Sequence, residues 1–236
     1  MPGTGARRSV LALTLATALS AGMAGAAADE PSQPYSIAER HLFMDDHLRA
    51  LPGRATVLSY HFVKAGSFET PFDDRVIEEI GAPDAAADNG RPVKVEFLSG
   101  SHKMDLPPIE GAKGNPVIMG FLEHDVREMS RITGGGGSQG AYYKKRLRMA
   151  MVATNESHKV AVKWNGKEVA AEEFTLDPYK DDPARSRYAR FANKLYSFVL
   201  SDQVPGGVYS LKSVMRDGGA SGKVMIEESL TLTENK

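Results

Sequence analysis

Residues 115–152 read NPVIMGFLEHDVREMSRITGGGGSQGAYYKKRLRMAMV, and this stretch decides the fold because it separates two series of predicted strands. Its first half has apolar residues at spacings of three and four, which is typical of one face of a helix: Ile118, Leu122, Val126, Met129 and Ile132. Asn115 is a cap residue, and Pro116 suits the first helical position. Gly134 to Gly137 would end this helix, and Ser138 would begin a second one that runs to about Val152.

The segments on both sides of this helical pair alternate apolar and polar residues, as half-buried strands do. Three strands are predicted before the pair and five after it: Val57–Lys64, Asp74–Ile80, Val93–Leu98, Val160–Trp164, Glu168–Leu176, Lys194–Leu200, Val208–Met215 and Val224–Leu232. Asn165-Gly166 is a strong signal for a type I′ hairpin. Because few of the connections are helical crossovers, we expect an antiparallel sheet.

Two other segments complete the predicted fold. Ser36 and Glu39 have the spacing of a capping box, which predicts an N-terminal helix that runs to about Leu48 or Ala50. Ser99 to Gly114 is rich in glycine and proline and is predicted to be an irregular connection. The sequence therefore predicts an α+β fold, in which a strongly curved, mostly antiparallel sheet (a half-barrel) of about eight strands has a two-helix insertion and an N-terminal helix.

The N-terminus is typical of an exported bacterial protein. Arg7 and Arg8 precede an apolar stretch, Val10 to Ala21, and small residues follow it, so residues 1–28 are predicted to be a cleavable signal peptide. The arginine pair allows the twin-arginine route besides the general secretory one. Residues 29–35 would form a flexible tether and residues 36–236 a single periplasmic domain, with no transmembrane segment after cleavage.

Composition excludes several classes of function. The chain has no cysteine, so disulfides, thiol catalysis and cysteine metal sites are excluded. Loss of the predicted signal removes two of the 29 basic residues and none of the 30 acidic ones, which gives a formal net charge of −3. A nucleic-acid-binding domain would usually be strongly basic, so we do not expect a nucleic-acid partner.

Residues 136–140 match the G-x-S-x-G pattern of serine hydrolases, with Ser138 at the centre. That chemistry needs a strand-to-helix turn before the serine, whereas an amphipathic helix is predicted there. A flexible interhelical loop is therefore the favoured interpretation, and catalysis by Ser138 is an alternative.

The second helix suggests a binding site. A glycine-rich turn at a helix N-terminus can hold an anion, and six residues close to it could contact a phosphate or an anionic lipid head group: Tyr142, Tyr143, Lys144, Lys145, Arg146 and Arg148. The alternative is a solvated basic helix face. The Walker lysine pattern is absent, and we expect no cofactor.

Two histidines are candidates for a functional role. His41 and Asp45 lie one helical turn apart and could share a metal ion, although polar residues on an amphipathic helix are the favoured interpretation. His124 and Arg127 lie away from the apolar stripe and are predicted to be solvated. Trp164, on the predicted hairpin, is predicted to be a core residue.

The order of elements resembles that of the periplasmic lipoprotein carriers, the LolA/LolB-like open barrels. The resemblance rests on the early strand Thr56 to Gly66, the helical insert Asn115 to Val152 and the late hairpin around Val204-Pro205-Gly206-Gly207. It implies a curved antiparallel sheet that holds an acyl chain beneath helical lids. No motif in it is specific enough to transfer a binding residue. Other phrases, such as Asn115-Pro116-Val117, are similar to those of uncharacterised proteobacterial exported proteins.

The leading hypothesis is a non-catalytic periplasmic protein that binds a hydrophobic or amphiphilic ligand in the hollow of the sheet. One alternative is an envelope hydrolase that uses Ser138 or a metal ion at His41 and Asp45. The other is an assembly factor that contacts an envelope protein through its basic helix face.

Overall fold

The computed structural model describes residues 35–135 and 137–233, with the side chains of residues 137 and 138 excepted. The predicted signal peptide (1–28) and the predicted tether up to residue 34 lie outside the described residues. Across the described ranges, none of the helices is both long and apolar enough to cross a membrane.

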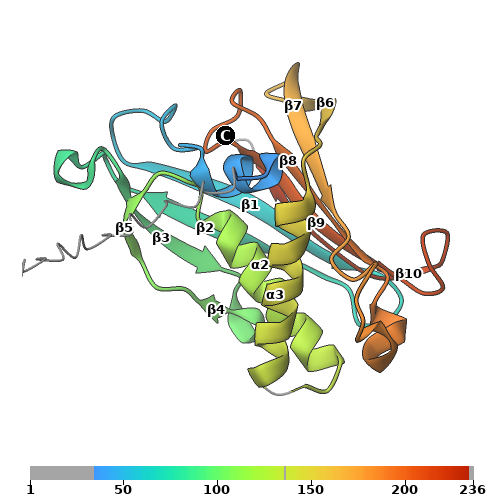
Figure 1. Cartoon of the computed structure of the whole chain (residues 1–236). Coiled ribbons are helices and arrows are strands. Elements are labelled where there is room, and N and C mark those ends of the chain that lie inside the picture. Colours follow the sequence, from blue (N-terminus) through green and yellow to red (C-terminus); the bar gives the residue numbers. More distant parts are fainter. Residues whose placement is uncertain (1–34, 136, 234–236) are drawn as a thin grey trace, which may run out of the picture. The chain divides into compact units, whose positions relative to one another are not determined.

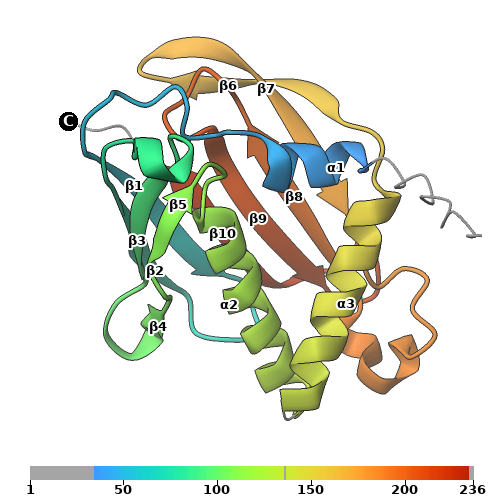
Figure 2. The same ribbon diagram turned by 60° about the vertical axis from the view of Figure 1, so that its left-hand side comes forward.

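The described strands form one antiparallel sheet that is open and curved (Figures 1 and 2). In chain order they are β1 (Thr56–Ala65), β2 (Phe72–Ile80), β3 (Arg91–Phe97), β4 (Met104–Asp105), β5 (Ile109–Ala112), β6 (His158–Trp164), β7 (Lys167–Leu176), β8 (Lys194–Leu200), β9 (Val208–Arg216) and β10 (Val224–Leu232). Their order across the sheet is β4-β3-β2-β1-β10-β9-β8-β7-β6, and β5 also pairs with β3. The predicted α+β class and curved antiparallel sheet are confirmed.

The described residues hold ten strands rather than about eight, because the predicted irregular connection Ser99 to Gly114 contains β4 and β5. Both are short and pair with β3, where Met104 lies opposite Phe97 and Ile109 lies opposite Val93. Their strand conformation depends on this pairing, which an alternation pattern over two to four residues does not reveal.

The hairpin between β6 and β7 has the predicted turn. Asn165 and Gly166 both have positive φ, 49° and 73°, as both central residues of a type I′ turn do. Trp164 at the end of β6 is buried, which confirms its prediction as a core residue.

Two helices, α2 (Val117–Ile132) and α3 (Gly137–Ala153), cover one face of the sheet (Figure 1). The α2 helix begins one residue later than predicted, with Pro116 as its N-cap residue. Asn115 still caps it, since its Oδ1 accepts a hydrogen bond from Val117 N–H at 3.0 Å. The space between the helices and the sheet contains large side chains with no exposed surface: Tyr60, Phe62, Phe97, Phe121, Phe174, Tyr196 and Phe198. Burial of each aromatic side chain contributes about 1.5–3 kcal/mol.

The N-terminal helix is shorter than predicted. The capping box of Ser36 and Glu39 is present, and it begins α1 (Ile37–Glu39), which continues as the π-helical η1 (Arg40–Met44). The helix does not reach Leu48, because Leu48 N–H donates to the carbonyl of Lys113 at 3.0 Å and is not available for a helical hydrogen bond.

Candidate functional site

Three helical segments border a groove of about 350 Å³. The α2 and α3 helices diverge from the turn that joins them, and α1 lies towards their open end (Figure 2). The residues that line the groove are mainly apolar: Glu39, Phe43, Met119, Leu122, Glu123, Val126, Lys144, Leu147, Arg148 and Met151.

Local structure places the groove-lining residue of η1. Ser36 Oγ donates to the carbonyl of Met151 at 2.8 Å, which ties the start of α1 to the end of α3. The π-helical turn that follows carries Phe43 to the groove. Such turns are rare and often occur at functional sites.

The floor of the groove is buried, and its edges are not. Val126 and Leu147 belong to the core, whereas 37% of Phe43 and 56% of Met119 is exposed. Large apolar side chains that face solvent around a concave surface are typical of a binding site for an apolar group.

Charged residues stand on the rim. Lys144 Nζ lies 2.7 Å from a carboxylate oxygen of Glu123, so this ion pair joins α3 to α2. Burial alone would raise the pKa of Glu123, but its contacts with Lys144 and Arg127 outweigh burial and hold this pKa below its usual value. Arg148, also on the rim, has no carboxylate of the described residues within 4.0 Å.

A more polar furrow adjoins the groove along α2 and α3. It has a volume of about 560 Å³ and shares Glu123, Val126 and Lys144 with the groove. Its other lining residues include Arg127 and Arg131. The surface of the helical layer therefore changes from apolar beside α1 to cationic near the turn between α2 and α3.

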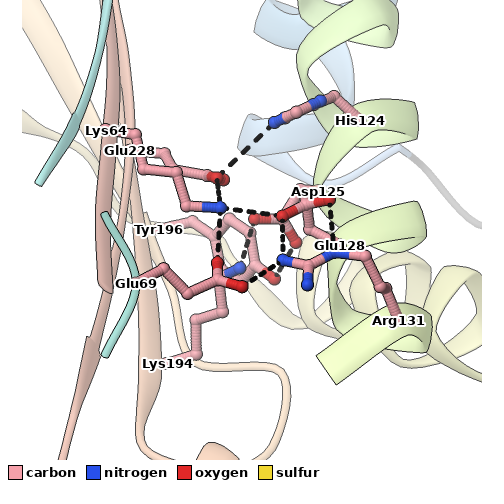
Figure 3. Close-up of polar contacts among 9 residues, drawn as sticks. All are labelled: Lys64, Glu69, His124, Asp125, Glu128, Arg131, Lys194, Tyr196 and Glu228. Carbon is pink, nitrogen blue, oxygen red and sulfur yellow. Dashed lines mark hydrogen bonds and ion pairs between the residues drawn. The ribbon is translucent and has the colours of Figure 1, made fainter. Parts of the chain in front are cut away.

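A network of ion pairs, buried at Lys64 and Glu228 and partly exposed at Arg131, holds α2 to the sheet (Figure 3). The centre is Lys64 of β1, whose ammonium nitrogen lies 2.8 Å from Glu69, 2.8 Å from Glu128 and 3.2 Å from Glu228 of β10. Arg131 extends the network, since its guanidinium contacts Glu69 at 2.6 Å and Glu128 at 2.7 Å.

A second part of the network lies next to the first. Asp125 of α2 forms an ion pair with Lys194 and accepts a hydrogen bond from the Tyr196 hydroxyl at 2.6 Å, both from β8. His124 Nε2 lies 3.5 Å from Glu228. These contacts fix the rotation of α2 about its axis, so they determine which of its side chains reach the groove.

The ion pairs shift the pKa values of the carboxyl groups in the network. Burial opposes their charge, but Arg131 and Lys64 hold the pKa of Glu128 at about 2. His124, Lys194 and Lys64 likewise hold the pKa of buried Glu228 at about 2. Both groups are therefore carboxylates at neutral pH. Breaking one partner of such a buried pair is strongly destabilising.

The six predicted ligand-binding residues do not lie together. Lys144 and Arg148 line the groove, and Lys145 is exposed. Tyr142 and Arg146 contact Asp182 in the connection between β7 and β8. Tyr143 is buried, and its hydroxyl donates to Thr133 Oγ1 at 3.0 Å.

The structural context of Ser138 differs from that of a hydrolase nucleophile. The residues before it form α2 and a turn, so the required strand-to-helix turn does not occur in the described part of this segment. The side chain of Ser138 lies outside the described residues.

The predicted metal pair has ordinary hydrogen bonds. His41 Nδ1 lies 2.7 Å from Asp45 Oδ2. The nearby His47 uses both ring nitrogens, since Nδ1 accepts from Asn115 N–H at 3.0 Å and Nε2 donates to the carbonyl of His41 at 2.7 Å. Burial lowers the pKa of His47, in agreement with a neutral ring. Among the residues that the structure describes, no group of three His, Asp or Glu side chains could hold a metal ion.

The prediction that His124 is solvated was wrong. It is buried, because α2 has a second buried face that includes Val117, Phe121, His124 and Asp125 and is directed at the sheet. Arg127 is exposed, as predicted. The sequence contained a sign of this second face, because His124 and Asp125 follow the apolar residues Val117 and Phe121 at helical spacing.

No protein-family model matches this chain, and no curated protein matches it. A solved structure of a LolA superfamily protein from Nitrosomonas europaea is similar to it at 10% sequence identity and a TM-score of 0.20. The match covers 84% of this chain and 91% of that one. The likeness is one of general outline.

Proposed function

We propose that this protein is an exported, non-catalytic binding protein for an amphiphile, which it holds in the groove between α1, η1, α2 and α3. The apolar chain of the ligand lies against Met119, Leu147 and Met151, and an anionic head group lies beside Lys144 and Arg148. The observation that carries the proposal is the mainly apolar groove with large exposed side chains at its edge and cations on its rim.

The proposed site is on the helices and not in the hollow of the sheet. Fully buried aromatic side chains, together with the ionic network around Lys64, occupy the described region between α2 and the sheet. An acyl chain there would have to displace paired charges, which are expensive to separate in a buried environment. The groove offers apolar contact without that penalty.

Methionine suits such a site. Met119 and Met151 have flexible, polarisable side chains that adapt to apolar ligands of different shape. Two glutamates and two cations line the groove, and Lys144 is paired with Glu123. Arg148 has no carboxylate partner within 4.0 Å in the described part of the chain, so it is the residue that favours an anionic head group over a neutral one.

The test is binding of dodecyl sulfate, below its micellar concentration, to wild-type protein and to two surface variants, Phe43→Ser and Met119→Glu. Both residues are partly exposed, so the variants should fold. We expect Met119→Glu to weaken binding at least about tenfold, equivalent to about 1.4 kcal/mol, because it places a negative charge at the groove. The matched control is Leu195→Ser on β8, whose side chain is 38% exposed and does not line the groove.

Dodecyl maltoside, which has an uncharged head group, measures the contribution of the rim. It should bind more weakly than dodecyl sulfate, and Arg148→Gln should remove the difference. Equal binding of dodecyl sulfate by all variants, or none by the wild type, would show that the groove is not the ligand site.

A further inference from the structure

A second pocket, of about 440 Å³, lies between α2, the connection from β1 to β2 and the segment that precedes β4. Half of the twelve residues that line it are charged: Lys64, Glu69, Thr70, Phe72, Ser101, His102, Lys103, Met104, His124, Arg127, Glu128 and Arg131. Part of the ionic network in Figure 3 forms its inner wall.

The charges in this pocket are predominantly positive. Four Lys and Arg side chains line it, against two glutamates. Glu69 and Glu128 are each paired with both Lys64 and Arg131, so their charge is neutralised from within the protein. Burial alone would raise the pKa of Glu69, but the contacts with Lys64 and Arg131 outweigh burial and hold this pKa below its usual value. Cations therefore outnumber carboxylates within the lining itself. Glu228, Glu123 and Asp105, which lie outside the lining, also pair with these cations, so attraction for an anion rests on N–H groups left without a partner and not on net charge.

Two arginines on α2 are held in place by carboxylates and still have N–H groups to offer. Arg131 uses Nε and Nη2 on Glu128 and Glu69, and its Nη1 has no hydrogen-bond partner in the described chain. Arg127 donates from Nε to Glu123, and neither of its two terminal nitrogens has a hydrogen-bond partner among the described residues. The two arginines are four residues apart, so they lie on the same side of the helix. A guanidinium fixed by a carboxylate loses less entropy when it binds a second anion.

The opposite wall provides further donors. Ser101 and Lys103 come from the segment before β4, where the ring of His102 stacks on Phe72 with centroids 3.9 Å apart. Lys103 has one ion pair, 3.2 Å from Asp105, and both side chains are largely exposed, so that pair is weak. Donors thus surround the pocket from α2 on one side and from this segment on the other.

We infer that this pocket binds a tetrahedral oxyanion, that is, a phosphoryl or sulfuryl group. Arginine forks match such groups, and donors from two walls suit an anion whose acceptors point in several directions. The anion is either a free ion or part of the head group of a larger ligand. The second source is chemically reasonable because Arg127 and Arg131 also line the furrow that adjoins the apolar groove.

The test is calorimetric titration with inorganic phosphate at pH 7.5. The variant is Arg127→Gln/Lys103→Gln, which leaves the buried network intact. The matched control is Lys94→Gln on β3, because Lys94 and Lys103 are each 57% exposed and paired with a carboxylate. We expect the double variant to weaken phosphate binding at least about tenfold and the control to leave it unchanged.

Dodecyl phosphate distinguishes the two sources. If phosphate alone binds and requires Arg127 and Lys103, the pocket takes the free anion. If only dodecyl phosphate binds, and requires these residues together with Met119, the pocket holds the head group of a groove ligand. If dodecyl phosphate binding is lost in Met119→Glu but unchanged in Arg127→Gln/Lys103→Gln, the oxyanion site is refuted and the groove stands. Phosphate binding that falls equally in Lys94→Gln, or no effect of the double variant on either ligand, also refutes it.

Discussion

Replacement of Glu78 by glutamine should stabilise the protein at neutral and alkaline pH. Glu78 lies on β2 with no exposed surface, and neither of its carboxyl oxygens has a hydrogen-bond partner in the described chain. Burial raises its pKa to about 8, and the nearby Val117 N–H, Tyr60 and Asn115 offset this only in part. Val117 N–H and the Asn115 amide are already bonded to other groups.

The size of the effect follows from the two pKa values. In the unfolded chain a glutamate ionises near pH 4.5, whereas in the folded protein this one stays protonated up to about pH 8. The stabilisation that comes from this tighter proton binding is fully present below pH 4.5 and is lost as the pH rises through 8. The total loss in the free energy of unfolding has an upper limit of roughly 5 kcal/mol. Between pH 5.5 and 7.5 the wild type should lose about 2 kcal/mol on this account, and Glu78→Gln should not.

Urea denaturation followed by fluorescence measures this, since the chain has one tryptophan, the buried Trp164. The control is Glu79→Gln, on the same strand but with 54% of its side chain exposed. The curves of unfolding free energy against pH should meet near pH 5 and diverge above it for Glu78→Gln only. Parallel curves for wild type and Glu78→Gln would refute the reasoning.

Three further outcomes test the packing that supports the site. Lys64→Met should lower the free energy of unfolding by about 3–5 kcal/mol in urea titrations, because it leaves the buried carboxylate of Glu228 without its lysine partner; no loss would mean that the network does not stabilise α2. Gly206→Ala should destabilise more than Gly166→Ala in thermal melts, since both have positive φ but only at Gly206 would a Cβ lie 2.5 Å from a leucine side chain; equal losses would contradict the packing. The pKa values of Glu128 and Glu228 are lowered to about 2, so the stability that their ion pairs provide should be present above pH 4.5 and disappear as the pH falls towards 2. Near-ultraviolet circular dichroism can follow this acid unfolding, and a transition centred above pH 5 would contradict the assignment.

Features with local causes were predictable from the sequence. The Asn165-Gly166 turn needs two residues with positive φ, and the capping box at Ser36 needs only a partner three residues away. Alternation predicted the eight long strands for a similar reason, because a strand with one wet face carries its period within itself.

Features that depend on distant partners were not predictable. The order of the sheet requires β1 to pair with β10, with Tyr60 opposite Leu232, and no local pattern specifies this. The burial of His124 was missed because the second buried face of α2 packs on the sheet, where the partner of His124 is Glu228, more than a hundred residues later. The candidate groove was not predictable for the same reason, since Phe43 and Met119 are distant in the sequence and line one groove only in the folded chain.

The most direct test of the proposed function is photo-cross-linking with a saturated fatty acid that carries a diazirine near the end of its chain. Labelled protein would be digested, and the modified residues would be identified by mass spectrometry. The groove predicts one label per protein, at Phe43, Met119, Leu147 or Met151, and little label in Met119→Glu. Labels confined to the strands beneath α2, or none above the level of the control lipid without diazirine, would contradict binding in the groove.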